Sequence, residues 1–183
     1  KDNEMDVLRE QVRMKNNFYI RAAGIGLFGN QVNERIADAA VTYFEDASGR
    51  LRPYGIGADG TMYEVRFFMR GYTIPITVGK IFSVLPTHNP NSGIYVEAGA
   101  QFMQHKVRID QIGGDVRQLA NEFLPGYDRL TNGFGAVQAI GYRYHGNNKF
   151  VNFEIGLQFT QNWTQSRRDF NFDYGFRDDR ERL

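Results

Sequence analysis

Side chains that commonly carry catalysis are sparse in this chain, which has three histidines and no cysteine. His88 and His145 lie in segments rich in turn-forming residues, where solvated side chains are expected. His105 shares one side of a predicted strand with Glu97, but the eight intervening steps place them about 26 Å apart. A Ser-His-acid hydrolase would need a serine beside His105 on a neighbouring strand. All the serines lie in or next to predicted loops or turns: Ser48, Ser83, Ser92 and Ser166. We therefore predict no catalytic residues.

The sequence also offers no metal, cofactor or nucleic-acid site. The lack of cysteine removes thiol catalysis and Cys-based zinc sites. The loop motifs GADGT, GGD and DFNFD do not have the ligand spacing of an EF-hand. Basic and acidic residues nearly balance, at 22 and 21, so no net charge favours a nucleic acid.

One pair of opposite charges lies where two strands face each other. Arg143 and Glu154 share a side of adjacent antiparallel strands joined by HGNNK, within reach of long side chains. If the strands close into a narrow barrel, this pair faces the lumen. It would then be either a selectivity element of a pore or a structural pair. We favour the structural pair, because side chains just fill the interior of a barrel of about eight strands.

The elements that position these residues are strands. Alternation with a period of two predicts strands at 18–28, 62–84, 93–110, 132–144 and 150–163. Residues 4–15 stay open between a charged strand and a short helix, and 33–44 are compatible with a helical turn or two. The connections alternate between long and short, which is typical of up-and-down outer-membrane barrels. We predict one all-β, antiparallel domain over residues 1–183.

The apolar face of 150–163 could point inward, as in a lipocalin, or outward, as in a membrane barrel. The long hairpin favours the second alternative. Apolar residues are even-numbered over 72–78 and 94–102, but odd-numbered in the outer parts of both strands. There the even positions hold charges, including Arg66, Arg70, Lys106 and Arg108, with Phe68 as the exception. If no bulge intervenes, one face changes from apolar to charged at matching heights, as expected where strands leave a bilayer. A β-bulge near Gly71 is the alternative, and Pro75 is unusual for a central strand.

Aromatic residues give a third indication. Tyr142 and Tyr144 lie at the short-turn end of one strand, and Trp163 lies at the far end of the next. Such residues form the interfacial girdles of membrane barrels. The sequence therefore predicts short periplasmic turns, long extracellular loops and an apolar face in lipid. The four charges at 66, 70, 106 and 108 would then contact lipopolysaccharide or a partner, or be solvated.

Six stretches carry a family resemblance: LFGNQVNE (27–34), NPNSGIYVEAG (89–99), QHKVRID (104–110), PGYDRLTNG (125–133), NFEIGLQFTQ (152–161) and RRDFNFD (167–173). With them, the chain resembles a family of outer-membrane β-barrel proteins from the Bacteroidota. The resemblance implies a small barrel of about eight strands. Some Bacteroidota barrels are accessory subunits of secretion or barrel-assembly machines. Relatives end on a strand after the RRDFNFD region, whereas this chain ends on DDRERL, so we expect one or more terminal strands to be missing.

We therefore expect a non-enzymatic protein of the bacterial outer membrane that acts through extracellular loops as a structural or accessory subunit. Its partners would be outer-membrane lipid, lipopolysaccharide and other outer-membrane proteins. The alternatives are a lipid-active enzyme or a narrow transporter, which need a groove or path that the sequence does not reveal. A soluble lipocalin-like barrel is less favoured.

Overall fold

The computed structural model describes residues 7–13, 15–32, 35–83, 92–146, 151–168, 170–173 and 175. The strands are β1 Val7–Arg13, β2 Phe18–Gln31, β3 Thr42–Glu45, β4 Leu51–Ile56, β5 Met62–Phe82, β6 Gly93–Ile112, β7 Thr131–His145 and β8 Asn152–Ser166. Three short helices accompany them: η1 Lys15–Asn17, η2 Arg117–Leu119 and α1 Leu124–Tyr127. His88 and the turn around it lie outside the described residues.

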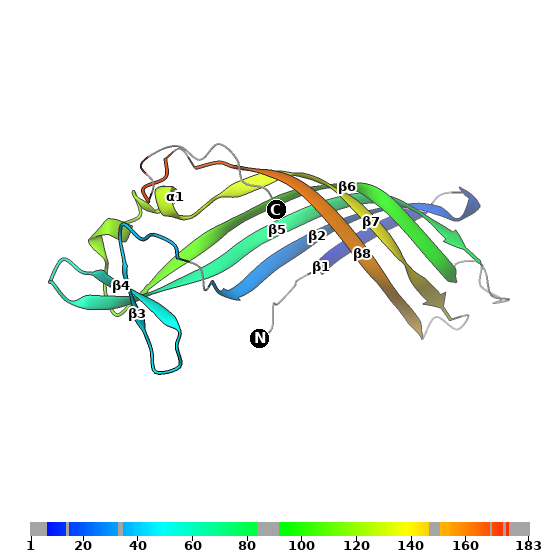
Figure 1. Cartoon of the computed structure of the whole chain (residues 1–183). Coiled ribbons are helices and arrows are strands. Elements are labelled where there is room, and N and C mark those ends of the chain that lie inside the picture. Colours follow the sequence, from blue (N-terminus) through cyan, green and yellow to red (C-terminus); the bar gives the residue numbers. More distant parts are fainter. Residues whose placement is uncertain are drawn as a thin grey trace.

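The described strands form one antiparallel sheet of eight strands, in the order β1-β2-β5-β6-β7-β8. The β3–β4 hairpin joins this path through β4, which pairs with β5. The sheet is not closed: β1 and β8 are its edges. Figure 1 shows the long strands curving together, with the hairpin and α1 at one end. The all-β, antiparallel prediction is confirmed, and the open segment at 4–15 contains a strand, β1.

Among the described residues of 33–44 no helix forms, and the helical turn left open by the sequence is limited to one turn, in which the Val41 amide donates to the Ala37 carbonyl at 3.0 Å. Residues 38–40 form a turn, and β3 begins at Thr42. The Tyr43 hydroxyl donates a hydrogen bond to the Ile36 carbonyl and accepts one from the Ile36 amide at 2.7 Å. The Tyr43 side chain therefore satisfies both backbone groups of Ile36 and links the two ends of the 36–43 segment.

The sheet has an inner face that is largely buried and an outer face that is exposed and apolar. Paired residues lie on the same side of a sheet, so the strand register defines the two faces. The outer face carries exposed residues on five strands: Ile20, Tyr72, Ile74, Ile76, Val78, Ile94, Val96, Phe134, Ile140, Ile155, Leu157, Phe159 and Trp163. We call this surface the apolar band. The apolar side of β8 therefore lies on the outer face.

The β5–β6 pairing runs without a shift from Glu64, opposite Ile112, to Phe82, opposite Ile94. The alternative of a bulge near Gly71 is therefore wrong for this pair. The register shift is on β2 instead, between Phe28 and Gln31. Since no extra residue separates the two halves of β5, its outer face does change from apolar to charged along one continuous strand.

Pro75 lies in a central strand, as the sequence indicates. The paired residues of β2 and β5 run from Ala22, opposite Ile76, to Ile25, opposite Thr73, with the two positions between them unpaired. Proline has no amide hydrogen to donate to a neighbouring strand. The ladder is interrupted at this place, and the register is the same on both sides of it.

Beyond the apolar band, the inner face holds a compact apolar core, which we call the cap core. Val65 and Phe67 of β5 and Val107 of β6 supply its floor. The connections around them supply its cover: Ile36, Ala37, Ala40, Val41, Val116, Leu119 and Tyr127. The change in parity thus has two consequences, a charged outer face and a water-excluded interior at the same height.

The RRDFNFD stretch (167–173) forms hydrogen bonds and ring contacts with the connections that cover the cap core. The Arg168 guanidinium donates to the Gly126 carbonyl at 3.2 Å, and the Asp173 carboxylate accepts from the Ala39 amide at 3.2 Å. The Phe172 ring lies 5.2 Å from that of Tyr127. Phe172 of this stretch therefore contacts the protein's own connections.

Candidate functional site

Four charged side chains meet on the inner face, between the strands that carry the apolar band. Arg143 of β7 contacts Glu154 of β8 through Nε and Nη2, each 2.9 Å from Oε2. Arg21 of β2 reaches the same Glu154 oxygen at 3.0 Å and Glu97 of β6 at 2.9 Å. The structure thus brings Arg143 and Glu154 together. It adds Arg21 and Glu97, and the cluster balances two cations against two anions.

Hydroxyl groups complete the coordination of the most buried acid. The Glu97 side chain is 4% exposed. It accepts a hydrogen bond from the Tyr19 hydroxyl at 2.6 Å and another from the Thr77 hydroxyl at 3.1 Å. A buried charge is costly unless it is paired and hydrogen-bonded, and Glu97 meets both conditions.

Two tyrosine rings pack against the arginines. The Arg143 guanidinium lies 4.7 Å from the ring centre of Tyr19 and 5.3 Å from that of Tyr95. Small residues make room for them: a Cβ at Gly79 would lie 2.4 Å from the Tyr19 ring, and one at Gly156 would lie 2.2 Å from the Tyr95 hydroxyl. Glycines on the strands thus fit the aromatic residues of the inner face.

The space left beside this cluster is small. A cavity of about 20 Å³ lies between Arg21, Thr77, Glu97 and Gln158. A cavity of this size holds about one water molecule. The geometry fits a packed, structural charge cluster.

The aromatic residues predicted for a girdle lie within two rows on the outer face. At the turn end, the Tyr144 and Phe153 rings stack at 5.3 Å, and Tyr142 lies 6.4 Å from Phe153. At the other end, Phe134 pairs with Trp163 across β7 and β8. Phe102 and Tyr72 extend that row, with ring centres 5.5 Å from Phe134 to Phe102 and 6.2 Å from Phe102 to Tyr72.

The separation of the two rows can be compared with the apolar band of membrane barrels. Phe153 and Trp163 are ten residue steps apart on β8, which corresponds to about 33 Å along a strand. A tilt of about 40° reduces this to about 25 Å, the height of the apolar band in membrane barrels. The sequence prediction missed Tyr72, Phe102 and Phe134, because they were assigned to the apolar alternation alone.

The four predicted outer-face charges lie beyond the band, and each has a local partner. Arg66 Nε lies 3.0 Å from Glu64, Arg108 Nε 2.7 Å from Asp110, and Lys106 Nζ 3.9 Å from Asp128. The hydrogen bond from Arg66 lowers the pKa of the Glu64 carboxyl, whereas burial raises the pKa of Asp128.

Arg70 is used differently from the other three. It donates to the Gly29 carbonyl at 2.8 Å, beside the register shift of β2, and lies over the Phe28 and Phe68 rings. The shift frees a backbone carbonyl from the ladder, and Arg70 satisfies it. Its role is therefore tied to the fold, and its guanidinium is partly engaged.

The histidine positions give no catalytic arrangement among the described residues. His105 pairs with Thr131 of β7, and Thr131 pairs with Ser166 of β8, so Thr131 stands between the histidine and the serine. The His145 ring lies 3.0 Å from the Asn152 side chain near the turn end. No group of three or more His, Cys, Asp or Glu side chains that could hold a metal occurs in the described part of the chain.

Comparisons with protein-family models, with curated proteins and with solved structures found no match. The resemblance to the Bacteroidota barrels therefore stays a prediction. In the described residues, no helix has the length and apolar character needed to cross a membrane.

Proposed function

We propose that this protein is an integral β-barrel of a bacterial outer membrane, closed from about eight strands, with no catalytic activity of its own. One observation carries the proposal. The outer face of β5 is apolar and exposed from Tyr72 to Val78, and it carries Arg66 and Arg70 on either side of Phe68 beyond that segment, in an uninterrupted register with β6. A face that meets water along its whole length has no reason to change in this way. A face that leaves lipid does.

The inner face supports the same proposal. Charged side chains at membrane depth face the protein interior and pair with one another. The charged cluster lies on the side of the sheet away from the apolar band, as the interior of a narrow barrel requires. The soluble-barrel alternative places the charges in the ligand cavity and the apolar band in water, which is unfavourable on both faces.

We propose that the end of the sheet that carries the cap core binds the partner protein. There β5 and β6 extend past the apolar band, and the connections fold into a packed surface that includes Phe123 and Phe172, both exposed. A rigid platform of this kind suits contact with another outer-membrane protein. The proposed role is a structural or accessory subunit of a membrane complex.

The test uses membranes from cells that express the full chain. They are extracted with alkaline carbonate, and the retained protein is run on a detergent gel before and after heating. Retention with a heat-dependent change in mobility supports the proposal, because closed membrane barrels resist detergent until they are heated. Release as a monomer without detergent contradicts it. Copurification in mild detergent then tests for a partner subunit.

A further inference from the structure

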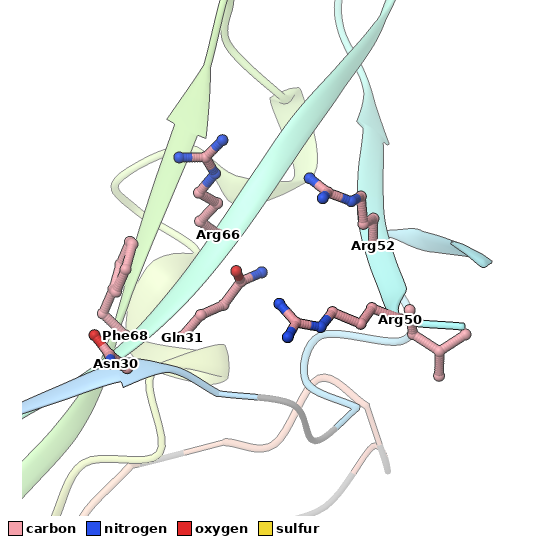
Figure 2. Close-up of a pocket in the computed structure, with 7 residues that line it drawn as sticks. Asn30, Gln31, Arg50, Arg52, Arg66 and Phe68 are labelled. Carbon is pink, nitrogen blue, oxygen red and sulfur yellow. The ribbon is translucent and has the colours of Figure 1, made fainter. Parts of the chain in front are cut away.

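A cleft opens on β5 where its two neighbours diverge. On one side, β2 pairs with β5 as far as Phe68, and β4 takes over only at Glu64. The fork between them encloses a cavity of about 460 Å³. Its walls include Asn30, Gln31, Arg50, Arg52, Arg66 and Phe68. Figure 2 shows Arg50 and Arg52 extending from one wall toward Arg66 and Gln31 on the other.

The three guanidinium groups are only partly neutralised. Glu64 pairs with Arg66 at 3.0 Å and with Arg52 at 3.4 Å. Asp46 pairs with Arg52 at 2.9 Å. Three cations against two carboxylates leave one positive charge. Within the described residues, the Arg50 guanidinium has no carboxylate partner, and it is the group that leaves the cleft positive.

The loop before β4 fixes Arg50 at the mouth of this cleft. The Asp46 carboxylate accepts hydrogen bonds from the backbone amides of Ser48 at 2.8 Å and Arg50 at 3.0 Å. Hydrogen bonds from Ser48 and Arg52 hold the pKa of Asp46 well below its usual range, so the carboxylate is ionised at neutral pH. The turn therefore fixes the backbone of Arg50 beside the cleft, and its exposed side chain extends toward the cavity (Figure 2).

We propose that this cleft binds a phosphate group. Guanidinium groups donate in pairs to phosphate oxygens, and the Asn30 and Gln31 amides supply neutral donors on the facing wall. The volume falls in the range of small-molecule sites, which is enough for a phosphate with part of its carrier. The Phe68 ring offers a flat apolar surface for that carrier.

The position of the cleft indicates where the phosphate comes from. Phe68 and Arg66 precede Tyr72 on β5, on the side away from the apolar band, so the cleft begins next to the aromatic row that ends the band. Headgroups of anionic lipids would lie at this height. This assignment deepens the proposed function and rests on it, whereas binding of free phosphate does not. The experiment therefore has one arm for each source.

The purified full chain in detergent is titrated with inorganic phosphate and followed by ³¹P NMR. In the second arm, the chain is reconstituted in phosphatidylcholine vesicles with or without phosphatidic acid, and lipid contact is read from the phosphatidic acid ³¹P signal. The variant is Arg50→Gln. The matched control is Arg117→Gln, which removes the same charge from an exposed site on η2. We expect Arg50→Gln to weaken phosphate binding about tenfold and Arg117→Gln to leave it unchanged.

Each outcome decides something different. Phosphate binding in detergent that depends on Arg50 supports the site, and a matching loss with phosphatidic acid assigns it to a lipid headgroup. Equal losses in Arg50→Gln and Arg117→Gln mean general charge attraction and overturn the site. No binding in either arm also overturns it. Failure to insert into vesicles, with phosphate binding intact, counts against the membrane proposal alone.

Discussion

Arg21 on β2 and Glu154 on β8 are in contact at 3.0 Å, although β5, β6 and β7 lie between their strands in the sheet. Four strand spacings in a flat sheet would separate them by about 19 Å. The sheet must therefore curl tightly around its inner face. Gln101 of β6 and Asn162 of β8 show the same curl, with a hydrogen bond of 2.6 Å across one intervening strand. A curl of this tightness is what the proposed narrow barrel requires.

The first prediction concerns the charge cluster. Glu97→Gln keeps the shape of the side chain but leaves Arg21 and Arg143 with one carboxylate between them. Removing one partner of a buried ion pair costs about 3–5 kcal/mol, so we expect a clear drop in the urea midpoint of unfolding in detergent. Glu45→Gln, on the exposed strand β3, is the control and should have little effect. Equal stability of both variants would mean that the cluster is not a buried network.

A partial rescue sharpens this prediction. The double variant Glu97→Gln with Arg143→Gln restores charge balance, since Arg21 and Glu154 remain as one pair. It should be more stable than Glu97→Gln alone. If instead the two losses simply add, the cluster residues act independently and the inner face is more hydrated than proposed.

The second prediction tests which medium surrounds the outer face. Ile76 and Ile112 are both exposed on the outer face of the β5–β6 pair, but Ile112 lies beyond the apolar band. In a membrane, Ile76→Lys should cost about 2–4 kcal/mol and Ile112→Lys about 0–1 kcal/mol. The readout is the urea midpoint of the protein folded into lipid vesicles. If both substitutions are equally mild, the outer face meets water.

The third prediction uses the single tryptophan of the chain, Trp163. It is 60% exposed and lies in the aromatic row at one end of the apolar band. In vesicles, its fluorescence should be quenched most strongly by lipids brominated near the headgroup. In a Trp163→Phe background, Ile76→Trp should respond most to lipids brominated deep in the chains. Identical depth profiles for the two positions would contradict the proposed orientation of the band.

The sequence predicts those parts of the architecture that depend on interactions between residues close together in the chain. Alternation reports which side of a strand is exposed, so the long strands and the change of face on β5 and β6 could be predicted. The contact of Arg143 with Glu154 could be predicted because a short connection joins their strands. The contact of Arg21 with Glu154 could not, since it depends on strand order and on curl.

The parts that the sequence did not reveal lie in the long connections. The cover of the cap core has no strand periodicity, because its residues come from irregular segments, whereas the floor residues Val65, Phe67 and Val107 follow the alternation of β5 and β6. The sequence did not indicate Arg50 as a candidate binding residue for a similar reason. Its place in the cleft depends on the turn around Asp46 and on the divergence of β2 and β4, neither of which leaves a repeating pattern.

The fourth prediction concerns pH and the cover of the cap core. Burial raises the pKa of the Tyr43 hydroxyl from 10.0 to about 12. The folded protein thus holds this proton more tightly than the unfolded chain. The stabilisation is complete below pH 10 and is lost as the pH rises toward 12. We expect a loss on the order of 2 kcal/mol between pH 9 and 11.5. The measurement is the urea midpoint of unfolding at both pH values.

Tyr43→Phe separates this effect from general alkaline unfolding. It leaves the backbone groups of Ile36, which is 1% exposed, without the hydrogen bonds of the hydroxyl. We expect a cost of about 1–3 kcal/mol at pH 9 and a smaller further loss at pH 11.5 than in the unmodified protein. Tyr54→Phe on β4 is the matched control and should keep the full alkaline loss. If Tyr43→Phe loses stability with pH as steeply as the unmodified chain, Tyr43 does not hold the cover in the way described.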